Sequence, residues 1–251
     1  MDHISVRDLT VRYGDYLVVH DVSFSVRRGD IFVIMGGSGC GKSSLLNAMI
    51  GLLEPAAGEV LYSGQSFTRA TPEDRRALSR RFGVLFQFGA LWSDMTLAEN
   101  VALPLEELVH LGRRDSRELA ELKLGLVGLR GAADRYPDEI SGGMRKRAGL
   151  ARAIALDPEI LFFDEPSSGL DPISARRLDD LMIELRDSMN TTIVQVSHDL
   201  ASIFATADDG IFLDAQQKTV TARGSPKELL AHPPNREVHA FLTRTPEKEA
   251  S

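Results

Sequence analysis

The sequence has little that could cross-link it or hold it in a membrane: one cysteine, one tryptophan and no long apolar run. With Cys40 as the only thiol, no intrachain disulfide can form, so a hydrophobic core must stabilise the fold. We interpret Cys40 as a small tolerated side chain rather than a redox group. No apolar run approaches about 18 residues, and the start, MDHISVRD, lacks the features of a secretory signal. We therefore expect a cytoplasmic chain.

Positive charge is also in deficit, with 29 Lys and Arg against 36 Asp and Glu and a net charge of -7. Surfaces that bind nucleic acid are usually basic, so we expect no nucleic-acid partner. The 251 residues, 43% of them hydrophobic, are enough for the core of one large α/β domain. Global disorder is excluded.

The most informative segment present is GGSGCGKS at residues 36–43, which follows the apolar run 31–35. It matches the pattern G-x-x-x-x-G-K-[ST], in which a glycine-rich loop directs backbone N–H groups toward phosphate oxygens at a helix N-terminus. Lys42 would add charge at the β- and γ-phosphates, and Ser43 would offer a hydroxyl to Mg²⁺. The alternative is a glycine-rich turn before an unrelated helix. The predicted nucleotide-binding residues here are Gly36, Gly37, Ser38, Gly39, Cys40, Gly41, Lys42, Ser43 and Ser44.

The periodicity of apolar residues predicts an α/β fold with a mostly parallel sheet, an antiparallel β flank and an inserted helical region. The first thirty residues alternate as strands do, and residues 95 to 155 have helical periodicity throughout. Further predicted elements are a helix over 42–50, strands over 58–64, 82–87, 159–164, 191–197, 210–214 and 218–222, a helix starting near 71 and a helix over 173–188.

Two acids close the apolar strand Ile160–Phe163. An aspartate at the carboxyl end of a strand beside a phosphate loop is well placed to hold Mg²⁺, and the adjacent glutamate to polarise an attacking water. We therefore predict Asp164 as a metal ligand and Glu165 as the catalytic base. The alternative is a strand that simply ends in an acidic loop.

The order of the motifs resembles the nucleotide-binding subunit of ABC transporters. Its parts are Tyr13, GGSGCGKS, Gln87, the signature Ser141-Gly142-Gly143, FFDE, SGLD at 168–171, and VSHD with His198. The resemblance implies a P-loop NTPase of ABC type, a single ABC ATPase domain over 1–251. It also implies a RecA-like core with the antiparallel β flank at about 1–87 and 157–242, a helical subdomain at about 88–156, and a polar tail at about 243–251.

Ser141 is a good helix N-cap, and the glycines after it leave N–H groups bare for a second phosphate site. In the ABC family two subunits pack head to tail, so the resemblance implies a homodimer in which Ser141, Gly142 and Gly143 cap the partner's ATP. It further implies that Asp171 communicates across the dimer. Met144 stands where the family normally has Gln, and we expect altered contacts there rather than loss of activity.

The resemblance assigns catalytic roles to Lys42, Glu165, His198 and Gln87. It implies that His198 contacts the γ-phosphate and that Gln87 approaches Mg²⁺ and the attacking water. It also has Tyr13 stack on adenine. Tyr13 could instead be a packed tyrosine at a strand end, and Gln87 merely a polar strand terminus. The expected cofactors are ATP and Mg²⁺.

Residues 86–107 and 141–172 look specifically like the ATPase subunit of Mla-type systems, which serve MCE-domain lipid trafficking between bacterial membranes. This implies a phospholipid cargo, a permease docking near Gln87 to Trp92, an MCE-domain partner and a place on the cytoplasmic side of the inner membrane. The apolar loop could instead seat the helical region. Amino-acid importers, lipoprotein exporters, division-type regulators and an inactive ATP-binding module stay open as alternatives. Relatives with a longer carboxyl-terminal tail grip their partner with it, a contact left open for a chain that stops at Ser251.

Overall fold

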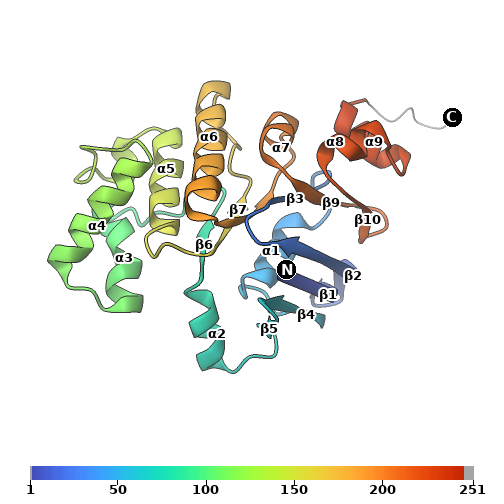
Figure 1. Ribbon diagram of the computed structural model, residues 1–251, viewed down its shortest axis with the longest axis horizontal. Helices are drawn as coiled ribbons and strands as arrows, with labels where there is room; N and C mark the ends of the chain where they lie inside the picture. The colour runs from blue at the N-terminus through green and yellow to red at the C-terminus, as the bar shows by residue number, and fades with distance from the viewer. Residues whose placement is uncertain (1, 246–251) are drawn as a thin grey trace. The chain divides into compact units, whose positions relative to one another are not determined.

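The structure is a computed structural model that describes residues 2–245. Its backbone contacts divide it into two compact units, which we describe separately (Figure 1). The first unit comprises the described parts of Met1–Arg75 and Val194–Ser251, and the second is Arg76–Ile193. Two elements cross from one unit to the other: α2 (Pro72–Ser79) and β8 (Thr192–Val196).

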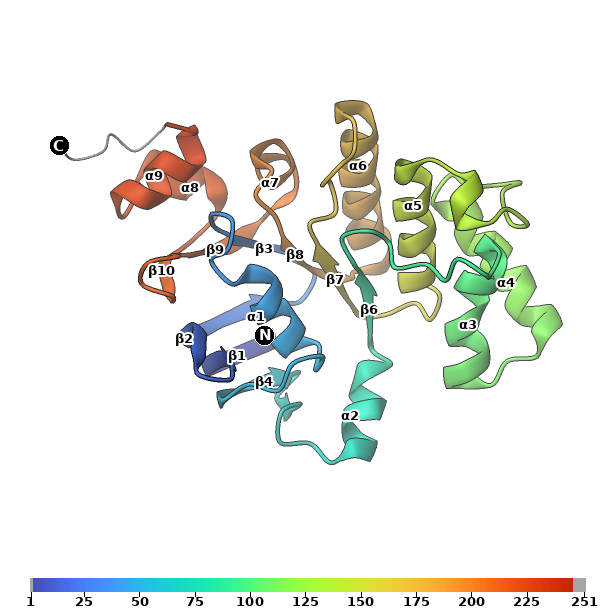
Figure 2. The same ribbon diagram turned by 180° about the vertical axis from the view of Figure 1, so that it is seen from behind.

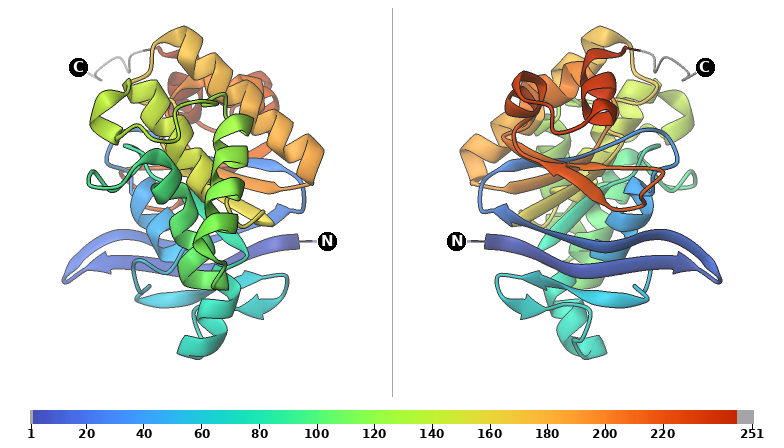
Figure 3. Two further views of the ribbon diagram at one scale, coloured as in Figure 1. Left: turned by 90° about the vertical axis from the view of Figure 1, so that its left-hand side faces the viewer. Right: turned by 90° about the vertical axis from the view of Figure 1, so that its right-hand side faces the viewer.

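The first unit contains the antiparallel β flank that the sequence predicts. Its strands are β1 (Asp2–Tyr13), β2 (Tyr16–Arg27), β4 (Ala57–Tyr62) and β5 (Gln65–Ser66), in the order β2-β1-β4-β5. Figure 3 shows β1 and β2 as two long neighbouring strands. Val6 lies opposite Phe24 on β2 and Val60 on β4, so alternate side chains of β1 enter the core.

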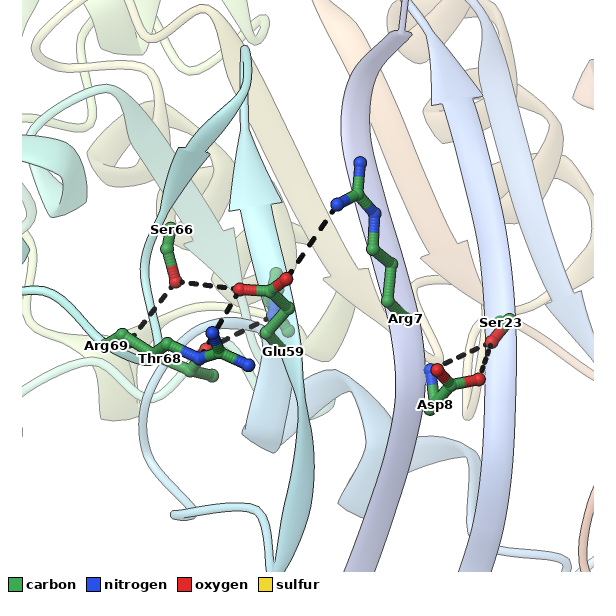
Figure 4. A network of polar contacts seen from close by, with 8 residues as sticks. Arg7, Asp8, Ser23, Glu59, Ser66, Thr68 and Arg69 are labelled. Atoms are coloured by element: carbon green, nitrogen blue, oxygen red, sulfur yellow. Dashed lines mark hydrogen bonds and ion pairs between the residues drawn. The ribbon is translucent and has the colours of Figure 1, made fainter.

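Polar contacts join the strands of this sheet on its exposed surface (Figure 4). The Ser23 hydroxyl on β2 accepts a hydrogen bond from the Asp8 N–H and donates one to the Asp8 carboxylate, at 2.8 and 3.0 Å. On β4 the Glu59 carboxylate lies 3.8 Å from Arg7 and 3.6 Å from Arg69, and it accepts a bond from Ser66. Exposed ion pairs of this kind contribute little to stability, so burial of the apolar side chains is the main stabilisation of this sheet.

The first unit also holds the strand before the phosphate loop, β3 (Ile31–Met35), whose five residues are all buried. β3 pairs in parallel with β9 (Asp209–Leu213), which pairs with β10 (Val220–Arg223). The β9–β10 pairing is antiparallel because a short hairpin joins the two strands, so the strand predicted at 218–222 departs from the parallel pattern.

Helices of the first unit cover β3 and β9. They are α1 (Lys42–Met49), α7 (Leu200–Thr206), α8 (Pro226–Ala231) and α9 (Arg236–Thr243). Figure 2 shows α7, α8 and α9 following β8 and β10 along the chain. Val33 and Met35 of β3 pack in one cluster with Ile203 of α7, Leu229 of α8 and Val238 of α9. This core fixes the position of β3 and hence the start of the phosphate loop.

The second unit combines a parallel strand pair with helices. β6 (Phe82–Leu85) pairs in parallel with β7 (Ile160–Asp164), in the register Phe82 to Ile160. The remaining elements are α3 (Leu97–Val109), α4 (Arg113–Leu126), the short 3₁₀ helix η1 (Pro137–Glu139), α5 (Gly142–Ala153) and α6 (Pro172–Met189). α3, α4 and α5 pack on one another, and α5 packs on β6.

Local structure agrees with the predicted elements wherever the described residues allow comparison. The strands and helices predicted at 31–35, 42–50, 82–87, 159–164 and 173–188 are present within a few residues, and no strand occurs between 88 and 156. The grouping into a core and a helical subdomain stays a prediction. The tail predicted at about 243–251 lies outside the described residues from residue 246 onward. No helix within 2–245 is both long and apolar enough to cross a bilayer.

Candidate functional site

The phosphate loop of the first unit joins the end of β3 to the start of α1. Gly36, Gly39 and Gly41 have φ angles of 151°, 77° and 101°, which side chains other than glycine rarely adopt. A Cβ at Gly36 would lie 2.5 Å from the Leu213 carbonyl oxygen, so the loop is packed against β9 at this point. A Cβ at Gly37 or Gly39 would meet nothing within 4 Å. One side of the loop is therefore packed and the other is open, as a phosphate cradle requires.

Lys42 folds back over this loop rather than into solvent. Its Nζ donates to the carbonyl oxygens of Gly36 and Gly37, at 2.9 and 2.8 Å, and the side chain is buried. Gly41 is the N-cap residue of α1 and has no side chain, so the first N–H groups of α1 receive no side-chain cap. A buried ammonium beside a helix N-terminus creates a positive site suited to an oligophosphate.

Cys40 of this loop has a buried side chain, with its Sγ 3.8 Å from the Lys42 Nζ. Burial raises the pKa of the thiol, and the nearby ammonium opposes that shift. A buried thiol with a raised pKa is a poor nucleophile. This agrees with the interpretation of Cys40 as a small tolerated side chain.

Two further predicted residues of the first unit lie near the loop. The Tyr13 hydroxyl is 3.4 Å from the Ser44 Oγ on α1, and the Tyr13 ring is half exposed, so it is not a packed core residue. His198 is exposed and follows Ser197, whose N–H bonds the Ile34 carbonyl oxygen of β3. His198 thus starts from a backbone anchored beside the strand that leads into the phosphate loop.

In the second unit, β7 ends at the two predicted acids. Asp164 is partly buried and Glu165 is 9% exposed. Glu165 has a φ of 50°, a left-handed conformation uncommon for a residue other than glycine and typical of functional turns. Gln87, two residues beyond the end of β6, donates from Nε2 to the Ser168 Oγ at 3.3 Å, so the structure joins Gln87 to the turn after Glu165.

The signature segment forms the N-terminus of α5. The Ser141 Oγ accepts a hydrogen bond from the Met144 N–H at 3.2 Å, which makes Ser141 the N-cap that the sequence predicts. Ser141 and Gly142 are exposed, and the nearest atom to a Cβ at Gly142 would be 3.9 Å away. The N-terminus of α5 is thus open to a ligand from outside the chain.

Asp171 caps the next helix, α6. Its Oδ1 accepts from the N–H groups of Ile173 and Ser174, at 3.1 and 3.0 Å. Hydrogen bonds from Ser174, and from the Ile173 N–H, lower the pKa of Asp171. Within this chain the carboxylate therefore has a structural task, and its exposed position leaves it accessible to a second subunit.

Two groups that sequence reasoning missed hold loops and turns of the second unit in place. Arg152 of α5 donates to the carbonyl oxygens of Gly89 and Ala90, at 3.0 and 2.7 Å, and so holds the loop after Gln87. Lys146, also on α5, donates to carbonyl oxygens in the turn after Glu165. The charge of the helix was visible in the sequence, but the carbonyls that it meets were not.

An apolar pocket of about 420 Å³ lies in the second unit, beside the strand that leads to Gln87. Trp92 and Phe88, in the loop that follows, are exposed by 58% and 80%. Exposed aromatic side chains and apolar pockets are both typical of protein-binding surfaces. The pocket is lined chiefly by Phe82, Val84, Phe86, Leu103, Leu108 and Leu156.

The residues predicted to hold Mg²⁺ can be compared, each within its own unit, with the oxygen ligands that this ion prefers. Within residues 2–245 no three His, Cys, Asp or Glu side chains cluster as metal ligands. Mg²⁺ in nucleotide sites is usually bound by one or two protein oxygens together with phosphates and water. In the first unit the Ser43 hydroxyl offers an oxygen of that kind, and in the second unit the Gln87 amide and the Asp164 carboxylate do.

A phosphate loop on a buried parallel strand, a strand ending in Asp-Glu and a serine-capped glycine helix together define an ATP-binding cassette. The family model described as ABC transporter matches residues 19–168, and the chain belongs to this family of ATPases. It is similar over 90% of its length, at 42% identity, to the intermembrane phospholipid transport system ATP-binding protein MlaF of Haemophilus influenzae, of which it covers 85%. It is 40% identical to MlaF of Escherichia coli K12, over 95% of this chain and 88% of that protein.

The fold is similar to that of solved ATP-binding cassettes. One is the ATP-binding cassette MJ0796, in a dimeric, post-hydrolysis structure with bound ADP and phosphate. It superposes with a TM-score of 0.80 and 26% identity, over 88% of this chain and 98% of that chain. The predicted fold class and family are confirmed.

Proposed function

We propose that this chain hydrolyses ATP to power phospholipid transport between bacterial membranes, through a separate permease and an MCE-domain partner. The buried Lys42 in an open glycine loop is the observation that carries the ATPase part of the proposal. The phospholipid part is supported by the similarity to the two MlaF proteins, which are ATP-binding proteins of intermembrane phospholipid transport systems. In such a system the chain would lie peripherally on the cytoplasmic side of the inner membrane.

The first unit would bind the nucleotide. Lys42 and the loop N–H groups from Gly36 to Ser44 would hold the β- and γ-phosphates, and Tyr13 would stack on adenine. His198 would donate a hydrogen bond to the γ-phosphate. Mg²⁺, held by Ser43, Gln87 and Asp164 directly or through water, would neutralise charge on the phosphate oxygens.

Glu165 would accept a proton from the attacking water as the water oxygen forms a bond to the γ-phosphorus. The bond from that phosphorus to the bridging oxygen breaks, and ADP leaves with the bridging electron pair. Gln87 would orient the water. These roles require Glu165 and Gln87 to act on the nucleotide that Lys42 binds.

We further propose a head-to-tail homodimer. The exposed N-terminus of α5 would direct the Ser141 hydroxyl and the N–H groups of Gly142 and Gly143 at the γ-phosphate bound by the partner subunit. Asp171 would face the same partner. The dimeric state of the similar cassette MJ0796 supports this arrangement.

The permease would dock on the loop Gln87 to Trp92. The exposed Phe88 and Trp92 of this loop, and the apolar pocket lined by Phe86, would offer contacts to a short segment of an integral-membrane protein. Arg152 would fix the position of this loop relative to Gln87, because it binds the carbonyl oxygens of Gly89 and Ala90, which lie between Gln87 and Trp92.

Phosphate release and bound lipid test the proposal. The native complex, purified through a tag on this chain, should release phosphate from ATP, and Lys42→Ala should remove both nucleotide binding and turnover. Glu165→Gln should retain ATP but lose turnover by about 100-fold or more. Mass spectrometry of the complex should identify a permease, an MCE-domain protein and bound phospholipid. Phosphate release unaffected by Lys42→Ala would refute the ATPase assignment, and a complex with neither partner would refute the transport assignment.

A further inference from the structure

The ammonium group of Lys146 is buried where the turn after the catalytic strand folds back. The residue is only 5% exposed, and it extends from α5, the helix that begins behind Ser141. Its Nζ donates to the carbonyl oxygens of Glu165, Pro166 and Ser168, at 3.1, 2.7 and 2.5 Å. An ammonium has three N–H donors, so this turn takes all of them.

The turn needs such a cation. Glu165 adopts a left-handed conformation, and its carbonyl oxygen also accepts the Ser168 N–H at 3.2 Å, which closes the turn. Three carbonyl oxygens that converge on one point repel one another, and buried carbonyls are costly without donors. A charged donor at their centre satisfies all three and stabilises a backbone that would otherwise be strained.

The same turn is joined to Gln87. The Ser168 hydroxyl accepts a hydrogen bond from the Gln87 Nε2 while the Ser168 carbonyl oxygen accepts one from Lys146. Lys146 is therefore connected, through one turn, to both Glu165 and Gln87. A rotation of α5 would shift this turn, because the Lys146 side chain joins the helix to the turn.

We propose that Lys146 is a positioning residue for ATP hydrolysis: it fixes the backbone of Glu165 and couples that residue to the helix that carries the signature serine. The proposal rests on the proposed function, in which Glu165 is the base. Lys146 touches neither water nor nucleotide in this role. Removal of the Lys146 ammonium should therefore reduce the stabilisation of the transition state and leave ATP binding intact.

Three substitutions separate positioning from packing. Lys146→Met keeps the length and apolar stem but removes the donors and the charge. Lys146→Arg keeps the donors and the charge. A cavity of about 20 Å³ beside Lys146 gives room for the larger head group. Lys123→Met is the matched control, because Lys123 is equally buried in the same unit and pairs with Asp157, away from the turn.

The assay is steady-state phosphate release by the purified native complex. We expect Lys146→Met to lower kcat by about 10-fold to 100-fold with KM for ATP within about twofold, as for a misplaced catalytic group. Lys146→Arg should recover most of the lost kcat, and Lys123→Met should keep the wild-type kcat despite a comparable loss of stability.

A pH profile provides a readout that packing would not move. Burial lowers the pKa of Lys146 to about 8, against the opposing effect of the Glu165 carboxylate. The other charged groups facing it are Arg147 of α5 and Arg177 of α6, which line the small cavity. As pH rises through about 8, the wild-type chain loses the ammonium and the arginine variant keeps its charge. The ratio of wild-type kcat to Lys146→Arg kcat should fall.

The outcomes distinguish the two proposals. If wild-type turnover is absent or survives Lys42→Ala, the proposed function fails. If wild-type turnover is normal but Lys146→Met behaves as Lys123→Met does, the positioning role is overturned and the ATPase assignment stands. If Lys146→Met does not fold, the ratio of wild-type to arginine-variant kcat decides, and a ratio that is constant with pH overturns the role.

Discussion

Gly83 in β6 provides a stringent test of the packing in the second unit. A Cβ at this position would lie 2.0 Å from the Ala153 carbonyl oxygen at the end of α5 and 2.8 Å from its carbonyl carbon. Both atoms are backbone, so a rotamer change cannot relieve the contact. In Gly83→Ala the strand and the helix must separate by about 1.4 Å, from 2.0 to 3.4 Å, to restore an ordinary contact.

Overpacking of this kind costs about 1 to 3 kcal/mol, and a backbone clash falls at the upper end. A loss of about 3 kcal/mol would lower a urea midpoint by about 1 M if the slope is near 3 kcal/mol/M. Trp92 is the only tryptophan and lies in the same unit, so its fluorescence reports unfolding of the unit that contains Gly83.

Gly125→Ala is the matched control. Gly125 lies in α4, its φ is not left-handed, and a Cβ there would meet nothing within 4 Å. Alanine should stabilise the unit by about 0.5 kcal/mol because it restricts the unfolded chain. A Gly83→Ala midpoint equal to that of wild type, or a Gly125→Ala midpoint that falls as far, would refute the packing described for β6 and α5.

Two further predictions concern helix N-termini. Ser141→Ala should destabilise α5 by about 1 kcal/mol through loss of the cap, whereas Ser141→Asn should restore stability without restoring phosphate release; equal thermal melting of the two variants would contradict the capping role. Hydrogen bonds from the Thr96 N–H and hydroxyl lower the pKa of Glu99 below its ordinary value of 4.5. Because the folded-state pKa is depressed, Glu99 stabilises the fold above about pH 4.5, and this contribution is lost as pH falls. The difference in urea midpoint between wild type and Glu99→Gln should shrink between about pH 6 and pH 3, and a constant difference would be the contrary result.

Much of the fold could be predicted because its signals are local. The run Ile31–Met35 is apolar at every position, and a strand buried on both faces needs this composition. Antiparallel pairing of β10 was not predicted, because a pattern of alternating residues does not specify which neighbour a strand joins.

The candidate site divides in the same way. The sequence by itself determined the phosphate loop, the paired acids and the serine cap, because each depends on residue types at fixed short spacing. Only the tertiary structure decided that Lys146 meets the turn after Glu165 and that Arg152 holds the loop after Gln87. Those contacts join residues far apart in the chain, and they form only when packing brings a buried cation to carbonyl oxygens of a distant turn or loop.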